Sequence, residues 1–242
     1  MSDHHAPFSA VLFDCDGVLV DSEPITNRVL HGMLHELGWE ITDEECVRRF
    51  IGRGLKDEWR IIEQHTGVRI DEAWLDEFRE RRNEALRGGL EAVDGIFEAI
   101  EGVRERVGDR FACVTGADRA KVEFQLRATG LDRAFGNRVF SGMEVARTKP
   151  APDVYLAAAD SLGVDPATVA VVEDSVAGVT AGVAAGASVF GFTPPGPTST
   201  SPAALVAAGA VTTFTAMGEL PSLLDRLRRA RQQGQGRGHP AR

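Results

Sequence analysis

The chain has 242 residues, and its 27 basic and 36 acidic side chains give it a net charge of −9 at pH 7. A chain of this length can bury a sizeable core, either as one domain with an insertion or as two unequal domains. The excess of acidic over basic side chains argues against a general nucleic-acid-binding protein. We therefore expect a globular protein with no nucleic-acid partner.

The cysteines and the first residues bear on the cellular compartment. The three cysteines, Cys15, Cys46 and Cys113, are too few and too widely spaced for a disulfide framework, which fits a reducing compartment. Residues 1–7 lack the basic and apolar regions of a signal peptide, and no apolar run reaches the length of a membrane span. We expect a soluble cytoplasmic protein, a monomer or weak homodimer, with no membrane partner.

The first stretch with a chemical signature is a short apolar run, residues 10–13, that ends directly in Asp14, Asp16 and Gly17. The run has the length of a buried strand, and ligands bind at the carboxyl ends of strands in a parallel sheet. Two carboxylates this close repel each other unless a cation lies between them, and their oxygens suit Mg²⁺. An ordinary turn before Gly17 explains the same residues, so this stretch alone leaves both interpretations open.

Two patterns of apolar residues divide the rest of the chain. Residues 24–87 have the periodicity of helices, are punctuated by glycines and contain no strand pattern. From residue 95 onward helices alternate with apolar strands. The expected helices cover 95–107, 118–129, 152–162 and 175–185, and the expected strands cover 110–114, 138–140, 169–172, 188–192 and 211–214.

This alternation predicts an α/β fold with a doubly wound parallel sheet. The expected core domain comprises residues 1–21 and 90–231. The all-helical segment 22–89 is then an inserted cap domain over the carboxyl end of the first strand, a position that suits a lid. Residues 232–242 are rich in Arg, Gln and Gly, and we expect a disordered tail there.

Three further strand ends carry polar groups. One strand ends in Thr115-Gly116, whose hydroxyl and backbone N–H groups could hold an anion. Lys149 lies in a loop stiffened by prolines, and a later strand ends in Glu173-Asp174. Each feature by itself also fits a turn or a solvated side chain. Together with the first acidic pair, they predict one site at the carboxyl edge of the sheet.

These motifs, in this order, resemble those of the haloacid dehalogenase superfamily of phosphohydrolases. Residues 14–21 resemble its first motif, Thr115 the second, Lys149 the third and Glu173-Asp174 the fourth. The helical segment resembles the cap of the subfamily that contains β-phosphoglucomutase and phosphoglycolate phosphatase. The resemblance covers nearly the whole chain and implies the hydrolysis of phosphate esters by an α/β core with a helical cap.

The resemblance also implies a role for each motif. Asp14 would attack the phosphorus and form an aspartyl-phosphate. Asp16 would protonate the leaving alkoxide and then take a proton from water. Thr115 and Lys149 would hold the phosphoryl oxygens. The implied cofactor is Mg²⁺, and the implied metal ligands are Asp14, the backbone carbonyl of Asp16, Asp174 and, directly or through water, Glu173.

Two features distinguish between reactions of the superfamily. Family dehalogenases and phosphonatases lack a carboxylate at the place of Asp16, so its presence favours phosphate esters. Family β-phosphoglucomutases commonly have His where Thr26 or Asn27 stands, and residues 52–57 depart from their cap signature Gly-x-Ser-Arg. We therefore expect a phosphatase. The alternatives are a phosphosugar mutase, a phosphoglycolate phosphatase and a non-catalytic sensor of phosphorylated metabolites.

The expected substrate is a small phosphate monoester, a sugar phosphate or a sugar-acid phosphate. Five stretches are similar to a bacterial branch that includes 6-phosphogluconate phosphatases: residues 21–25, 49–52, 90–95, 140–142 and 211–215. This similarity makes 6-phosphogluconate one candidate substrate.

The cap is expected to contact the sugar part of the substrate. A sugar acid needs a cation, for which Arg49, Arg53 and Lys56 are available. Arg49 and Lys56 also fit solvated positions on amphipathic helices. Glu23 and Asn27 lie at the start of the cap, and we expect them to contact sugar hydroxyls.

Overall fold

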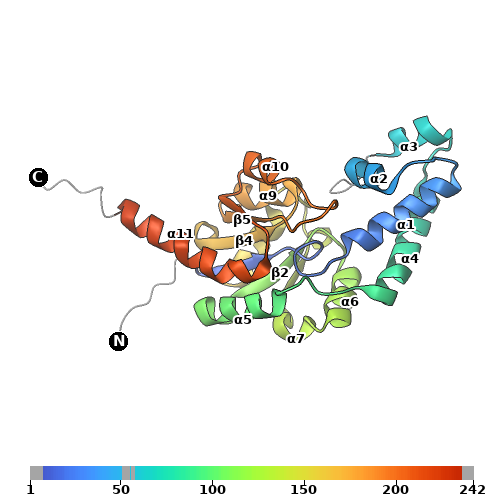
Figure 1. The fold of residues 1–242 in the computed structure, drawn as a ribbon. Helices are drawn as coiled ribbons and strands as arrows, with labels where there is room; N and C mark the ends of the chain where they lie inside the picture. Colours follow the sequence, from blue (N-terminus) through green and yellow to red (C-terminus); the bar gives the residue numbers. More distant parts are fainter. Residues whose placement is uncertain (1–7, 51–54, 56–57, 236–242) are drawn as a thin grey trace, which may run out of the picture.

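The computed structural model describes residues 8–50, 55 and 58–235, with side chains to residue 227. Its centre is a six-stranded sheet with the strand order β3-β2-β1-β4-β5-β6 (Figure 1). Neighbouring strands all run parallel, which confirms the expected α/β class. The strands are β1 (Ala10–Phe13), β2 (Phe111–Thr115), β3 (Val139–Ser141), β4 (Val169–Glu173), β5 (Ser188–Phe192) and β6 (Thr212–Phe214).

Helices cover both faces of the sheet. One face packs against α5 (Ile96–Val107), α6 (Arg119–Thr129), α7 (Asp132–Phe135) and α11 (Leu220–Gln235). The other face packs against α8 (Asp153–Ser161), α9 (Val176–Ala184) and α10 (Pro202–Ala207). Short 3-10 turns lie at η2 (Gly142–Glu144), η3 (Pro166–Thr168) and η4 (Met217–Glu219).

Strand β1 shows why the sheet is doubly wound. Val11 and Phe13 belong to the apolar cluster under α5 and α11, whereas Ala10 and Leu12 belong to the cluster under α8 and α9. All four side chains are buried. A strand that is buried on both faces has no polar alternation, which explains the continuous apolar run in the sequence.

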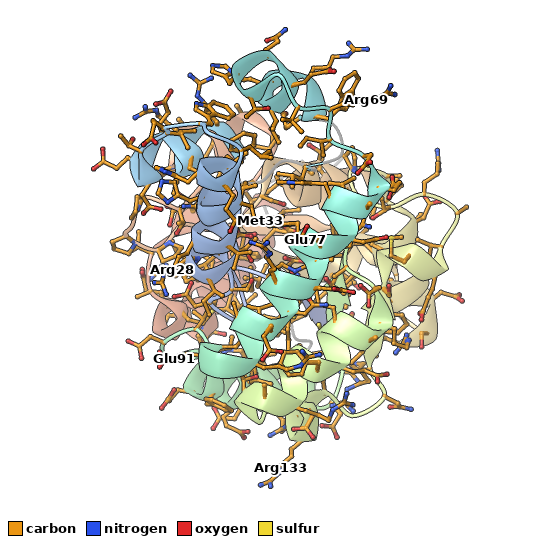
Figure 2. The ribbon with its side chains drawn as sticks, turned by 90° about the vertical axis from the view of Figure 1, so that its right-hand side faces the viewer. Arg28, Met33, Arg69, Glu77, Glu91 and Arg133 are labelled. Atoms are coloured by element: carbon orange, nitrogen blue, oxygen red, sulfur yellow. The ribbon has the colours of Figure 1, made fainter. Side chains whose placement is uncertain are left out.

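A helical insert between β1 and α5 comprises α1 (Glu23–Glu36), α2 (Asp43–Phe50), α3 (Trp59–Thr66) and α4 (Glu72–Gly89). It buries an apolar cluster of its own, which includes Met33 and Phe78. Helices α1 and α4 pack side by side, with Met33 on α1 and Glu77 on α4 (Figure 2). The insert lies beyond one end of the sheet (Figure 1). The division into a core domain and a cap domain stays a prediction.

Two local features differ from the sequence predictions. The short helix α7 was not expected, because four residues are too few to show a helical period. Helix α11 runs to Gln235, so residues 232–235 continue a helix instead of starting a tail; residues 236–242 lie outside the described residues. Gly88 and Gly89 lie at the end of α4, where the glycines of this segment were expected. Among the described helices, none has the length and apolar character needed to cross a membrane.

Helix α9 approaches the end of β4 closely. Its N-cap is Ser175, whose hydroxyl accepts a hydrogen bond from the backbone N–H of Gly178. A Cβ atom on Gly178 would lie 1.6 Å from Oε1 of Glu173. The buried carboxylate of Glu173 therefore requires glycine at this position of the helix.

We expect Gly178→Ala to destabilise the protein by about 1–3 kcal/mol, because the added methyl group overpacks a buried site. Gly32→Ala is the matched control, since Gly32 also lies in a helix but a Cβ atom there meets nothing within 4 Å. The control should gain about 0.5–1 kcal/mol from the higher helix propensity of alanine. Urea unfolding measures both free energies, and equal effects would contradict the close approach of α9 to Glu173.

Candidate active site

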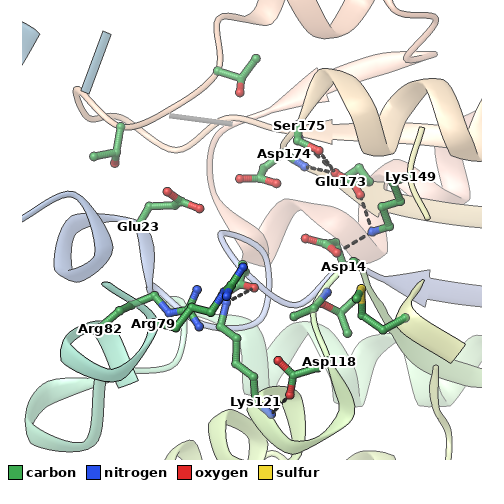
Figure 3. A pocket seen from close by; sticks show the side chains of 17 residues that line it. Asp14, Glu23, Arg79, Arg82, Asp118, Lys121, Lys149, Glu173, Asp174 and Ser175 are labelled. Atoms are coloured by element: carbon green, nitrogen blue, oxygen red, sulfur yellow. Dashed lines mark hydrogen bonds and ion pairs between the residues drawn. The ribbon is translucent and has the colours of Figure 1, made fainter. Parts of the chain in front are cut away.

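The structure brings the four strand-end motifs together. Asp14 directly follows β1, Thr115 ends β2, Glu173 ends β4, and Lys149 lies in the loop before α8. All four line a cavity of about 490 Å³ between the carboxyl edge of the sheet and the helical insert (Figure 3). This convergence follows from the parallel sheet, because strand ends that are far apart in sequence meet at one edge.

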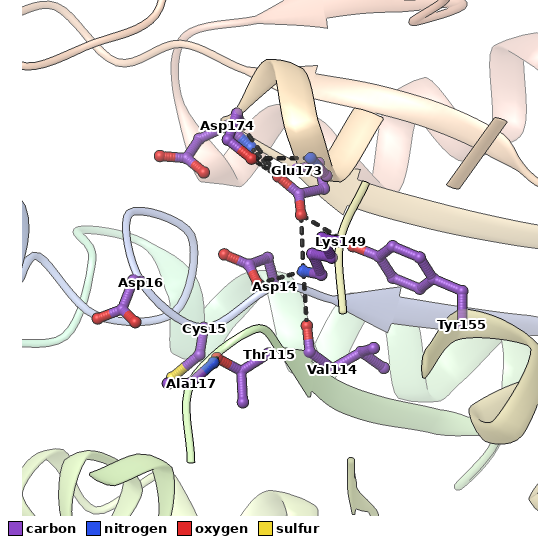
Figure 4. A network of polar contacts seen from close by, with 12 residues as sticks. Asp14, Cys15, Asp16, Val114, Thr115, Ala117, Lys149, Tyr155, Glu173 and Asp174 are labelled. Carbon is purple, nitrogen blue, oxygen red and sulfur yellow. Dashed lines mark hydrogen bonds and ion pairs between the residues drawn. The ribbon is translucent and has the colours of Figure 1, made fainter. Parts of the chain in front are cut away.

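Lys149 is the centre of a buried polar network (Figure 4). Its ammonium group donates to Oδ1 of Asp14 at 2.6 Å, to Oε1 of Glu173 at 2.7 Å and to the carbonyl of Val114 at 3.0 Å. Burial alone would lower the pKa of Lys149, but the charges of Asp14 and Glu173 outweigh burial and raise this pKa well above its ordinary value. Lys149 is therefore a fixed cation at the base of the cavity.

Glu173 is fully buried, and both of its carboxylate oxygens accept hydrogen bonds. Oε1 accepts from Lys149 and, at 2.9 Å, from the hydroxyl of Tyr155. Oε2 accepts from the backbone N–H groups of Asp174 and Ser175 and from the Ser175 hydroxyl. These contacts compensate for the loss of water around a buried charge. Tyr155 was not predicted, because a lone tyrosine on an apolar helix gives no indication of its partner.

Three carboxylates form an acidic cluster beside Lys149. One oxygen from each of Asp14, Glu173 and Asp174 lies within 4.8 Å of the others. Burial, opposed by Lys149 and reinforced by Glu173, raises the pKa of Asp14 to about 7. Burial and the charges of Glu173 and Asp14 raise the pKa of Asp174 well above its ordinary value. A hard cation would relieve this repulsion, so the cluster could hold a metal ion, as the sequence predicts.

The turn after Asp16 packs against Asp174. Gly17 has a φ angle of +78°, and a Cβ atom there would lie 2.1 Å from Oδ2 of Asp174. Glycine is required at this position both for the backbone conformation and for space. Within the part of the chain that the structure describes, no hydrogen-bond donor and no cation contacts the Asp174 carboxylate. Its oxygens are thus available to a ligand.

Asp16 points away from the acidic cluster. Its carboxylate accepts from the Ser22 hydroxyl at 2.6 Å, from the Lys121 ammonium group at 2.7 Å and from the Gln125 amide at 2.7 Å. Burial alone would raise the pKa of Asp16, but the charge of Lys121 and these hydrogen bonds lower it to about 2. The side chain of Asp16 is therefore not a ligand of the cluster, and its expected metal contact through the backbone carbonyl stays a prediction.

Neither of the two α6 residues that hold Asp16 was predicted from the sequence. Lys121 and Gln125 are four residues apart, so they share one face of the helix. That spacing was the only sequence feature that linked them. Nothing in the sequence showed that this face of α6 turns toward Asp16, more than 100 residues away.

Thr115 and Gly116 lie where an anion site was expected. Both line the cavity, and Thr115 is buried. Its Oγ1 accepts from the backbone N–H of Ala117 at 3.0 Å, which leaves the hydroxyl hydrogen to donate to a ligand. The residues therefore offer donors beside Lys149.

The residues expected to bind substrate from the insert have different surroundings. Glu23 lines the cavity, and burial together with the charge of Asp16 raises its pKa to about 7. Asn27 instead lines a neighbouring cavity of about 230 Å³, where its amide donates to Asp43 at 3.0 Å. Arg53 and Lys56 lie outside the described residues, so their contacts stay predictions.

The structure also shows which other cations of the insert line the cavity. Arg49 pairs with Glu45 on its own helix and lies over the ring of Trp39, so it fits the surface alternative. Arg79 and Arg82 of α4 line the cavity and were not predicted. The sequence shows that α4 is amphipathic but does not show which of its polar residues face the site.

Comparisons with known proteins agree with this geometry. A family model described as haloacid dehalogenase-like hydrolase matches residues 8–186, a range that contains all four motifs. The chain is 30% identical to the 6-phosphogluconate phosphatase of Escherichia coli (strain K12), over 88% of this chain and 93% of that protein. It is 34% identical to a plasmid-borne phosphoglycolate phosphatase of Cupriavidus necator, over 90% and 94% of the two chains.

A solved structure is also similar over most of its length. It is the crystal structure of a HAD family hydrolase from Deinococcus radiodurans R1 with bound phosphate and sodium. Its TM-score is 0.78 and its sequence identity is 36%, and the match covers 91% of this chain and 96% of that chain. The similarity confirms the expected fold.

We expect Mg²⁺ to stabilise the protein more at pH 8 than at pH 5.5. The pKa of Asp14 is higher in the metal-free folded protein than in the unfolded chain, so its contribution to stability is present at low pH and is lost as the pH rises through about 7. A bound cation offsets this loss, because it replaces protons on the cluster. Thermal unfolding should show that Mg²⁺ raises the free energy of unfolding by about 2 kcal/mol more at pH 8 than at pH 5.5, because of the titration of Asp14.

Two variants control this measurement. Asp14→Asn should lose most of the difference between the two pH values. Asp109→Asn should keep it, since the Asp109 side chain is 76% exposed and lies outside the cluster. An equal effect of Mg²⁺ at both pH values in the wild-type protein would contradict binding at the acidic cluster.

Proposed function

The chain belongs to the haloacid dehalogenase-like hydrolase family as a phosphatase, and we propose that it hydrolyses small phosphate monoesters with Mg²⁺ through an aspartyl-phosphate on Asp14. The observation that supports this proposal most directly is the contact between Lys149 and Asp14 beside an acidic cluster that suits a cation. A nucleophile, a fixed cation and a metal-binding cluster then lie together at the base of one cavity.

Asp14 is the proposed nucleophile. Lys149 contacts its Oδ1, and among the described residues nothing engages Oδ2, which can therefore attack the phosphorus. The attack forms a bond between Oδ2 and phosphorus and breaks the bond from phosphorus to the ester oxygen of the substrate. Lys149 transfers no proton in this step. Its charge reduces the repulsion between the carboxylate and the phosphate, both of which are anionic.

Asp16 is the proposed acid and base. With a pKa of about 2 it is a carboxylate at neutral pH, the state that accepts a proton from the water that hydrolyses the aspartyl-phosphate. In the first step it must instead donate a proton to the leaving alkoxide. We propose that Lys121 turns from Asp16 toward the bound phosphate, which raises the pKa of Asp16. An unchanged pH dependence of kcat/KM in Lys121→Met would contradict this exchange.

The residues present fit a Mg²⁺ ion, since the cluster offers hard oxygen ligands and the Asp174 carboxylate has no partner among the described residues. Asp14 and Asp174 would hold the ion through their carboxylates, and Asp16 through its backbone carbonyl. Glu173 would act through water, because both of its oxygens already accept hydrogen bonds from the protein. When bound, the ion neutralises and orients the phosphate. Thr115, Gly116 and Lys149 would hold the phosphoryl oxygens.

Sugar phosphates and sugar-acid phosphates are the proposed substrates. Relatives named 6-phosphogluconate phosphatase and phosphoglycolate phosphatase align with most of this chain, which makes these two esters the first candidates. The sequence departs from the mutase signature in residues 52–57, which argues against a mutase. Hydrolysis is therefore the reaction to test first.

The proposal predicts that the protein releases inorganic phosphate from at least one member of a panel of sugar phosphates, sugar-acid phosphates and phosphoglycolate. Release should require Mg²⁺ and stop with EDTA. Asp14→Asn should lower it by at least about a thousandfold, because the nucleophile is removed. Asp109→Asn, which makes the same change outside the cavity, should keep wild-type rates.

A folded wild-type protein that releases no phosphate from any ester in the presence of Mg²⁺ would contradict the proposal. Interconversion of sugar phosphates by the same preparation would then identify a mutase. Binding of these esters without any conversion would identify a sensor.

A further inference from the structure

Helix α4 of the insert forms a wall of the cavity away from the phosphate site. Arg79 and Arg82 extend from this helix into the cavity (Figure 3). They are three residues apart and share one face of the helix. Because Asp14 and Lys149 lie at the base of the cavity, the α4 residues face the part of a substrate that is remote from its reacting phosphate.

The two arginines differ in their partners. Arg79 forms ion pairs on its own helix with Asp76 and Glu72. Arg82 is half-buried and has no carboxylate within 4 Å among the described residues. Its Nε and Nη2 groups donate to Oδ1 of Asn83 at 3.3 and 3.0 Å, and its guanidinium carbon lies 5.8 Å from the ring centroid of Phe78. The groups that Arg82 contacts, Asn83 and Phe78, are thus neutral.

The other charged groups of the cavity do not supply an anion for Arg82. Asp16 is already paired with Lys121 at 2.7 Å. Asp118 caps α6 and accepts from the backbone N–H of Lys121. Burial lowers the pKa of Arg82, and the charges of Asp16, Asp118 and Glu23 oppose that effect without contact. A desolvated guanidinium in this position favours a ligand that brings its own negative charge.

We propose that Arg82 binds a carboxylate at the end of the substrate remote from the phosphate, and that it thereby selects sugar-acid phosphates over neutral sugar phosphates. The planar guanidinium can donate two parallel hydrogen bonds to a carboxylate, and such pairs are stronger than hydrogen bonds to hydroxyl groups. The inference rests on the proposed function, and it places the selecting cation on α4, outside the segment that contains Arg53 and Lys56.

A matched pair of esters tests the proposal. 6-Phosphogluconate and glucose 6-phosphate share the reacting phosphate and six carbons, but only 6-phosphogluconate has a carboxylate and an open chain, whereas glucose 6-phosphate is cyclic. Arg82→Met should lower kcat/KM for 6-phosphogluconate about 10- to 100-fold and that for glucose 6-phosphate less than about threefold. Arg82→Lys should fall between the wild type and Arg82→Met for the acid, because an ammonium group keeps the charge but lacks the planar fork.

Arg81→Met is the control variant. Arg81 is the neighbouring arginine of α4, but it pairs with Glu36 and Glu77 outside the cavity, so its removal should leave the ratio of the two kcat/KM values unchanged. Equal losses for both esters in Arg82→Met would overturn the proposal, because they would show that Arg82 maintains the site for any substrate. A changed ratio in Arg81→Met would overturn it as well.

A binding measurement tests the role of Arg82 independently of the proposed function. Calorimetric titration of Asp14→Asn, which cannot form the aspartyl-phosphate, should show tighter binding of 6-phosphogluconate than of glucose 6-phosphate, and the added Arg82→Met change should remove the advantage. If the wild type releases no phosphate from either ester, the proposed function fails while this titration still decides the role of Arg82. Equal affinities in Asp14→Asn, or an advantage that survives Arg82→Met, would overturn the inference.

Discussion

The buried ion pairs of Lys149 are the interaction on which the site depends. One ammonium group joins the end of β4 to the residue that follows β1, through Glu173 and Asp14. Removing one partner of a buried pair leaves a charge without compensation, which costs about 3–5 kcal/mol. Each contact in this network positions the next residue. Hydrogen bonds from Tyr155 and Ser175 fix Glu173. Glu173 in turn fixes Lys149, and Lys149 orients one oxygen of Asp14.

Two neighbouring aspartates line the same cavity, but their pKa values are shifted in opposite directions. Asp14 is buried among like charges, and its pKa is raised to about 7 although Lys149 contacts it. Asp16, two residues later, is held by Lys121, Ser22 and Gln125, and its pKa is lowered to about 2. Environments that separate the pKa values of paired carboxylates are typical of sites where the two groups have different roles. In this protein one aspartate lies in the acidic cluster, and the other faces α6.

The features that depend on local patterns could be predicted from the sequence. Buried parallel strands read as apolar runs, so β5 was predicted with its observed bounds. The ends of these runs located the residues at the strand ends. They were expected to lie together because a parallel sheet brings its carboxyl ends to one edge. A turn before Gly17 was one of two interpretations of the first motif, and the need for space beside Asp174 became visible only in the structure.

The features that depend on tertiary packing could not be predicted. Asn27 lies one helical turn after Glu23 on the same face of α1, yet Asn27 contacts Asp43 of α2 while Glu23 lines the cavity, because only the first turn of α1 reaches the cavity. Arg82 is one of several charged residues on α4, and only the position of the insert over the sheet shows that it lines the cavity. A single sequence does not contain these positions.

If Asp14 is the nucleophile, it carries the phosphoryl group during turnover. Mass spectrometry of peptides from enzyme that is quenched with acid during turnover of a good ester detects this intermediate. We expect a phosphorylated peptide that contains Asp14, formed with Mg²⁺ and absent after EDTA treatment. Phosphorylation of a different residue, or turnover with no phosphorylated enzyme under conditions where its hydrolysis is rate-limiting, would contradict this role of Asp14.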